Sequence, residues 1–160
     1  MLVIDVAMKL DQNVITFFKR QRYIIVSTID RRTKIPHNSC KGIVKIDESG
    51  IVYILDLYKW RTYANLKDNP NISITSVDEH KFKGWCLKGK GKIVPSEKLK
   101  KDVIAAWETK ISGRITHRMV KNMKEYSGHK RHPESQLPKP EYMIVMTVEQ
   151  VVDLIPRNVK

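Results

Sequence analysis

The sequence predicts a mainly β protein of the α+β class, with about six antiparallel strands in a small barrel and helices packed outside it. Two observations support this prediction. Short β-branched and apolar runs recur between turn-forming residues, and amphipathic helical patterns interrupt them at only a few places. The 160 residues suit one core, so we expect residues 1–160 to form a single domain.

The composition limits the partners and the compartment. The formal net charge is +13, which favours anionic partners such as a phosphorylated cofactor, an acidic substrate or nucleic acid. A basic surface that only keeps the protein in solution would give the same charge. No apolar run approaches the roughly 18 residues of a membrane span, and the first residues do not resemble a signal peptide. We therefore expect a cytoplasmic protein.

The two cysteines give no sign of a metal site. Cys40 and Cys86 both fall on predicted strands and belong to no CxxC pair. We expect reduced thiols that serve as small core or barrel residues, although the sequence leaves a disulfide open because it sets no distance between them. No spacing of Cys and His suggests zinc, so no metal is expected.

The first helix and strand follow from local patterns. Asp11 is a suitable N-cap for a helix over Gln12–Gln21. The apolar face of this helix consists of Val14, Phe17 and Phe18. The β-branched and apolar run Tyr23–Ile29 then predicts a buried strand.

A hairpin follows that strand. The chain enters a second strand at 35–40 and continues through Lys41–Ile46. The four residues Asp47–Gly50 form a loop that ends in glycine and leads into a third strand at Ile51–Leu57. Together the three strands predict an antiparallel meander.

The segment after the third strand is the place where chemistry is expected. A short helix over Arg61–Asp68 ends before Pro70, and a strand follows at Asn71–Val77. The unpaired amides and positive dipole of a helix start attract anions, and Lys59 and Arg61 add cationic donors. The same residues are also compatible with an ordinary helix start that carries solvated basic side chains.

This stretch resembles the flavin-binding split-barrel proteins related to pyridoxamine 5′-phosphate oxidase. In that family a barrel strand leads into a short helix with a basic residue and a Thr or Ser, then Asn/Glu-Leu and Asn-Pro. The matching positions here are Arg61-Thr62, Asn65-Leu66 and Asn69-Pro70. The resemblance covers about residues 20–155 and is strongest over 36–94. It implies a six-stranded antiparallel split β-barrel with flanking helices.

The pattern of the second half of the chain predicts one long strand, then a helical insertion at about 96–127, then a last strand. Residues 82–94 read as a strand pair or as one bent strand, interrupted by Gly84, Gly89 and Gly91. Pro95-Ser96 would cap a helix that ends at Ser112-Gly113, and a second helix would cover Arg114–Tyr126. The apolar face of the first of these helices consists of Leu99, Val103, Trp107 and Ile111. A basic, proline-containing loop at 128–140 and a strand at Glu141–Val148 complete the chain.

The resemblance also implies a cofactor and an assembly. It implies FMN at the interface of a homodimer, with the phosphate held by Lys59, Arg61 and Thr62 and the ring or ribityl chain along Asp56–Tyr58. Backbone and side chains at 37–41 would add strand contacts, and a strand of the second subunit would reach the cofactor. The full set of candidate cofactor-binding residues is His37, Asn38, Ser39, Lys41, Asp56, Leu57, Tyr58, Lys59, Arg61, Thr62, Trp85 and Lys88.

Three other functions remain open at the level of sequence. The first is an oxidoreductase of the same fold that uses the deazaflavin F420, whose polyanionic tail would suit a basic protein. The second is a basic barrel that binds nucleic acid by stacking bases on Tyr53, Tyr58 and Trp85. The third is a flavin storage or sensor protein without turnover. A flavin carries the electrons itself, so we assign no catalytic acid or base.

Overall fold

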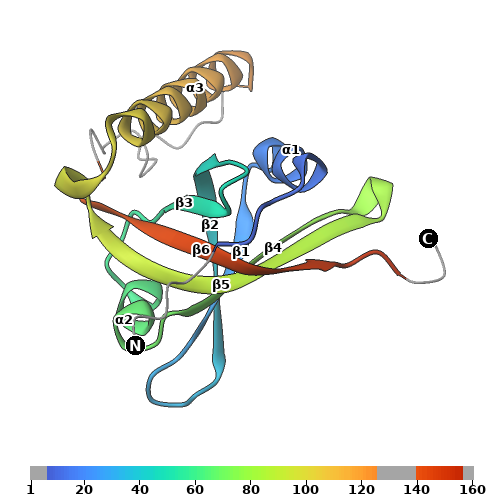
Figure 1. Cartoon of the computed structure of the whole chain (residues 1–160). Helices are drawn as coiled ribbons and strands as arrows, with labels where there is room; N and C mark the ends of the chain where they lie inside the picture. The colour runs from blue at the N-terminus through green and yellow to red at the C-terminus, as the bar shows by residue number, and fades with distance from the viewer. Residues whose placement is uncertain (1–6, 126–139, 157–160) are drawn as a thin grey trace.

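Six strands close into an antiparallel barrel in the computed structural model, which describes residues 7–125 and 140–156 (Figure 1). The strand order around the barrel is β1-β2-β3-β6-β5-β4. The strand bounds are β1 Ile24–Ile29, β2 Pro36–Ile46, β3 Ile51–Leu55, β4 Asn71–Asp78, β5 Lys83–Pro95 and β6 Tyr142–Asp153. This confirms the predicted six-stranded antiparallel split β-barrel.

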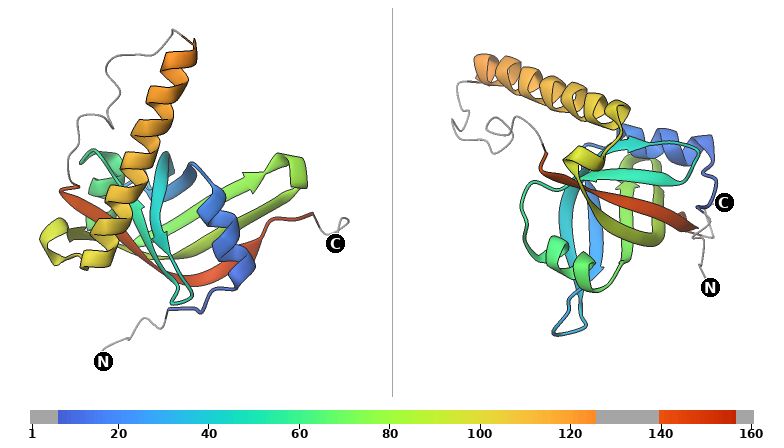
Figure 2. Two further views of the ribbon diagram at one scale, coloured as in Figure 1. Left: turned by 90° about the horizontal axis from the view of Figure 1, so that it is seen from above. Right: turned by 60° about the vertical axis from the view of Figure 1, so that its left-hand side comes forward.

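Helices in the described part of the chain lie outside the barrel. They are α1 Gln12–Arg20, α2 Arg61–Asp68 and α3 Lys101–Glu125, with single 3-10 turns η1 Glu79–Lys81 and η2 Ser96–Lys98. The Asp11 carboxylate accepts from the Asn13 amide and caps α1, as predicted. Figure 2 shows α2 at the opposite end of the barrel from α1 and α3. No helix in the described ranges is long and apolar enough to cross a membrane.

The first three strands form the predicted meander, and the last strand closes the barrel. Antiparallel pairs join β1 to β2 and β2 to β3. β6 then pairs with β3 on one side and with β5 on the other. The region 82–94 is therefore one strand, β5, which runs from β4 across to β6.

Glycine lets β5 bend at the point where its register with β6 shifts, between Lys88 and Gly89. A Cβ atom at Gly89 would overlap the carbonyl oxygen of Thr147 on the facing strand. The backbones of β5 and β6 therefore approach more closely here than any side chain would allow. This agrees with the predicted interruption of the strand by glycine.

Two apolar clusters support the fold. The larger fills the barrel and extends under α1, and it includes Phe18, Val26, Ile54, Ile74, Leu87 and Ile144. The smaller fixes α3 against the outside of the barrel, and it consists of Leu55, Val103, Trp107, Ile111 and Met143. Burial of these side chains is the main favourable term in folding, at about 1.5–3 kcal/mol for each large side chain. The predicted apolar face of α3 is thus the face that packs.

The prediction of two helices after β5 was wrong. α3 continues through Ser112 and Gly113. The helix also begins later than predicted, at Lys101, and Ser96–Lys98 forms a separate 3-10 turn before it. Gly113 is exposed, and an added Cβ would meet nothing within 4 Å. A helical glycine costs only about 1 kcal/mol relative to alanine, which the neighbouring hydrogen bonds offset. The predicted loop at 128–140 falls almost wholly outside the described residues.

Two glycine substitutions should have opposite effects on stability. Gly89→Ala should destabilise the protein by about 3 kcal/mol, because a methyl group forces β5 away from β6. Gly113→Ala should stabilise it by about 1 kcal/mol, since the site is open and helical. Urea unfolding followed by circular dichroism measures both. Equal stability of the Gly89→Ala variant and the parent would show that the close approach is absent.

Candidate functional site

The start of α2 contacts β2 through two hydroxyl groups. Thr62 is buried, and its Oγ1 lies 3.0 Å from Oγ of Ser39 on β2. Trp60, at the N-cap position, provides no side-chain hydrogen bond, so the first amides of the helix lack a capping acceptor. Arg61 is exposed, and its guanidinium carbon lies 5.2 Å from the centroid of the Trp60 ring. This end of α2 therefore offers amides, a hydroxyl pair and one cation to an anion.

A buried hydrogen bond fixes α2 in this position. Asn65 Nδ2 donates to Thr28 Oγ1 on β1 over 3.0 Å, and both side chains are buried. A polar pair buried in this way favours one arrangement, because any shift of the helix would leave its groups unsatisfied. Asn65, the first residue of the Asn65-Leu66 pair, thus has a structural role here.

The candidate residues on β2 lie on both of its faces. Every second residue of β2 points to the same face, so His37, Ser39 and Lys41 lie on one face and Asn38 on the other. The first three residues lie opposite the buried residues of β1, so their face is the inner one. Asn38 lies on the outer face, where its Oδ1 accepts a hydrogen bond of 2.7 Å from Ser27 Oγ. The strand therefore presents Ser39 to α2 and directs Asn38 to the outside.

A buried polar network connects β2, the end of β3 and the start of β6. Lys41 Nζ lies 2.5 Å from Asp56 Oδ1, and Tyr142 Oη donates to Asp56 Oδ2 over 2.9 Å. The Asp56 side chain is only 3% exposed and that of Lys41 is 11% exposed. Burial, together with the Asp56 carboxylate, raises the pKa of Tyr142 far above its usual range. The phenol therefore stays protonated and donates to Asp56.

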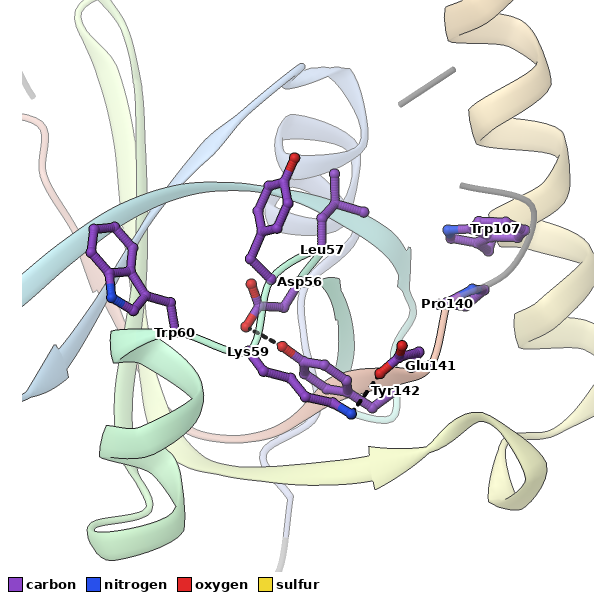
Figure 3. A pocket seen from close by; sticks show the side chains of 9 residues that line it. Asp56, Leu57, Lys59, Trp60, Trp107, Pro140, Glu141 and Tyr142 are labelled. Atoms are coloured by element: carbon purple, nitrogen blue, oxygen red, sulfur yellow. Dashed lines mark hydrogen bonds and ion pairs between the residues drawn. The ribbon is translucent and has the colours of Figure 1, made fainter. Parts of the chain in front are cut away.

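Lys59 has a different partner from Arg61. Its ammonium lies 2.5 Å from Glu141 and 5.9 Å from the centroid of the Tyr142 ring, as the dashed line in Figure 3 shows for the ion pair. The Glu141 carboxylate raises the pKa of Lys59. In this structure Lys59 thus contacts the start of β6, and Arg61 and Thr62 remain together at the start of α2.

Two cavities share the segment Asp56–Tyr58 in their lining. The larger has a volume of about 610 Å³. Its lining consists of Asp56, Leu57, Tyr58, Lys59, Trp60, Trp107, Pro140, Glu141 and Tyr142 (Figure 3). The smaller has about 140 Å³ and lies along β2. Its lining consists of Tyr23, Cys40, Lys41, Gly42, Leu55, Asp56, Leu57 and Tyr58.

Trp85 and Lys88 lie apart from the α2 site of the same chain. Trp85 packs partly buried against the core inside the barrel. Lys88 lies on the outer face, in a row that the strand registers continue through Ser73 and Ser27 to Asn38. Three strand spacings separate Lys88 from Asn38, or about 14 Å. The structure thus brings Ser39, Arg61 and Thr62 together and leaves these two residues elsewhere.

The structure also gives little support to stacking of nucleic-acid bases. Of the three aromatic residues considered for that role, Trp85 packs against the barrel core and Tyr53 packs against the cluster under α3. Tyr58 is 61% exposed. Stacking platforms need several exposed rings on one face, and these three rings do not form one.

Sequence reasoning did not identify Trp107, Glu141 or Tyr142 as site residues. Trp107 was predicted to be a core residue of a helix, and Tyr142 occurs in an apolar strand. A single tyrosine in such a strand can signal a buried hydroxyl that needs an acceptor, but the acceptor, Asp56, lies 86 residues away. Only strand pairing brings them together.

The fold and this site define a split-barrel protein in which the start of α2 contacts the second strand through Thr62 and Ser39. Residues 10–154 match the sequence profile described as pyridoxamine 5′-phosphate oxidase. The chain therefore belongs to the pyridoxamine 5′-phosphate oxidase family. No curated protein matches it in sequence.

Three solved structures show the same fold at low sequence identity. HupZ from Group A Streptococcus is 15% identical, with a TM-score of 0.63, and the alignment covers 91% of this chain and 95% of that one. HutZ from Vibrio cholerae, described as a heme storage protein, is 21% identical with a TM-score of 0.59 and coverage of 91% and 94%. An F420 reductase is 14% identical with a TM-score of 0.55 and coverage of 89% and 98%.

Removal of Asp56 should be among the most damaging single changes. Asp56→Ala leaves the buried Lys41 ammonium and the Tyr142 hydroxyl without an acceptor, which should cost about 3–5 kcal/mol. The double variant Lys41→Met with Asp56→Leu should recover most of that loss, because neither charge is then buried alone. Urea unfolding of Lys41→Met, of Asp56→Leu and of the double variant measures the coupling. Additive effects would show that the two groups do not interact.

Proposed function

We propose that this protein binds FMN and acts as an FMN-dependent oxidoreductase. The observation that carries the proposal is the contact of Ser39 with Thr62 beside Arg61, at a helix start without a side-chain cap. Charged and backbone donors at such a site suit the phosphate of a flavin mononucleotide. The flavin would supply the redox chemistry, and the protein would hold and orient it.

Charge compensation favours Arg61 as the cationic phosphate ligand. Lys41 and Lys59 each have a carboxylate partner at 2.5 Å, whereas no ion pair joins Arg61 to another described residue. A cation that already has a carboxylate contributes less to an incoming anion than one that has none. We therefore assign the phosphate to Arg61, Thr62 and the first amides of α2, with Lys59 at the edge of the site.

We assign the flavin ring to the smaller cavity beside β2. This cavity is too small to hold the ring alone, which favours a homodimer whose second subunit completes it. Its volume of about 140 Å³ is below the roughly 300 Å³ of typical ligand pockets. Tyr23 lines this cavity and also a second hollow of about 230 Å³ on the outer face of β1 and β4. Ile25 and Val77 on that face are 41% and 62% exposed. A second copy seated there would cover the apolar face and complete the flavin pocket.

Loss of the phosphate ligands should weaken FMN binding. The double variant Arg61→Ala with Thr62→Ala should bind FMN at least tenfold more weakly, since hydrogen bonds to charged groups contribute about 1.5–3 kcal/mol each. Quenching of flavin fluorescence measures the affinity. Arg20→Ala on α1 removes the same charge at the other end of the barrel and serves as the control. Unchanged affinity of the double variant would place the phosphate elsewhere.

The same titration separates the cofactor alternatives. The parent protein would be titrated with FMN, with F420 and with hemin, because related structures include an F420 reductase and a heme storage protein. Saturation by FMN at one per subunit is the expected result. Tighter binding of F420 would keep the fold and change the cofactor, and tighter binding of hemin would overturn the flavin proposal.

A charge on the apolar outer face should break the homodimer. Val77→Glu should convert a dimer into a monomer, since an unpaired carboxylate cannot be buried there without a cost of several kcal/mol. It should also weaken FMN binding, because the pocket is then incomplete. Sedimentation velocity measures the mass. Met8→Glu introduces the same charge at another exposed apolar residue and should leave the dimer intact. A monomeric parent protein that binds FMN would refute this arrangement.

A further inference from the structure

We propose that the end of the barrel formed by α2 and the β1–β2 loop, residues 30–35, binds the surface of a membrane that contains anionic phospholipids. The protein would lie on that surface, with the loop in the headgroup layer. The proposal does not rest on the flavin proposal, because the loop contributes no residue to the phosphate site that we assign to Arg61 and Thr62.

Basic residues collect at this end of the barrel. The loop and α2 together contain five basic residues and two acidic ones, Asp30 and Asp68. The basic residues, all exposed, are Arg31, Arg32, Lys34, Arg61 and Lys67. Figures 1 and 2 show the loop extending past α2, away from the barrel. A surplus of positive charge on a protruding part of the molecule attracts anionic surfaces.

Both acidic side chains are engaged within this end of the barrel. Asp68 forms an ion pair of 3.4 Å with Arg31, which fixes the loop against the end of α2. The Asp30 carboxylate accepts from the amide and the hydroxyl of Thr33 over 2.9 and 3.1 Å. Donation from Thr33 and, as a smaller effect, the charge of Arg61 lower the pKa of Asp30. The two carboxylates thus shape the loop, and the surplus of basic charge remains on the surface.

Three of the five cations have no carboxylate partner at all in the described part of the chain. Arg32, Lys34 and Lys67 form no ion pair with another described residue, and Lys67 Nζ lies 4.9 Å from the centroid of the Tyr63 ring. A basic residue close to an anionic lipid surface strengthens binding by a factor of about five. Several such residues together give a reversible attachment that salt weakens.

The backbone of the loop is satisfied internally, which favours a lipid surface over nucleic acid. The amides of Arg32 and Thr33 donate to the Asp30 carboxylate. The Lys34 amide donates to the Asp30 carbonyl over 3.0 Å, and that of Ile35 donates to the Thr33 hydroxyl over 3.3 Å. Peptide groups that already have partners enter a water-poor layer at little cost. Nucleic-acid phosphates are bound in part by backbone amides, and the amides of residues 32–35 are already used.

A large apolar side chain follows the basic residues of the loop. Ile35 is 63% exposed and comes directly after Lys34. The strength of binding at a membrane surface depends on the apolar area that enters it and on the attraction of basic residues to anionic lipids. The loop combines both contributions within a few residues, which is the reason we assign it to the headgroup layer.

The test is co-sedimentation with vesicles of phosphatidylcholine alone or with about a third of phosphatidylserine. Arg32→Gln with Lys34→Asn removes two charges from the loop, and asparagine tolerates the positive φ of 60° at position 34. Ile35→Ser removes the apolar side chain. Lys19→Ala with Arg20→Ala removes two exposed charges from α1, at the other end of the barrel, and serves as the control. Circular dichroism confirms that all variants fold.

We expect the parent protein to bind the anionic vesicles at low salt, to be released at high salt and to leave the neutral vesicles unbound. The loop double variant should bind roughly 25-fold more weakly, a factor of about five for each charge. Ile35→Ser should bind roughly fivefold more weakly, because less apolar area enters the membrane. The α1 double variant should lose at most about twofold, since its charges lie far from the surface.

Specific results would overturn the proposal. Equal binding to neutral and anionic vesicles, or no binding to either, would show that this end of the barrel does not recognise anionic lipid. An equal loss in the α1 double variant would show that only the overall charge of the protein matters. Unchanged binding of Ile35→Ser would show that the loop stays outside the membrane. Release of the protein from vesicles by duplex DNA, with loop-dependent binding to that DNA, would make nucleic acid the partner instead.

Discussion

Closure of the barrel by the last strand is the constraint on which the site depends. β6 is the only strand in the described part of the chain that pairs with both β3 and β5, and its first residue is Tyr142. Pairing of β6 with β3 brings the Tyr142 hydroxyl to Asp56 and the Glu141 carboxylate to Lys59. It also holds the start of the segment that leads into α2. Without β6 the start of α2 would still form, but Asp56 would lose the Tyr142 hydroxyl and Lys59 would lose the Glu141 carboxylate.

The distribution of paired and unpaired charge gives the two sides of this segment different chemistry. On the α2 side, Arg61 stays available while Thr62 and Ser39 supply hydroxyl groups. On the α3 side, every charge in the described lining has a partner, and four of the nine lining residues are aromatic. The first side therefore keeps a cation without an ion-pair partner among the described residues, and the second does not.

Local signals predicted most of the elements correctly because each of them follows from short-range rules. α2 was predicted with its observed bounds, since Pro70 prevents its continuation and a buried strand precedes it. The break predicted at Ser112-Gly113 was wrong, since a glycine followed by a good helical pattern ends a helix only when other forces also favour an end there. The Ser39–Thr62 contact fits the resemblance, but the sequence does not show that Lys59 pairs with Glu141.

Residue patterns alone predicted about six antiparallel strands, the basic charge, the helix start at Arg61-Thr62 and the family to which the chain is similar. These properties depend on residue type, on periodicity and on neighbours within a few positions. Only the folded chain shows which charges are compensated, that Asp56 is buried with Lys41 and Tyr142, and that Trp107 Nε1 is buried without an acceptor. Those facts depend on strand register and on distances between residues as many as 86 positions apart, which no local pattern encodes.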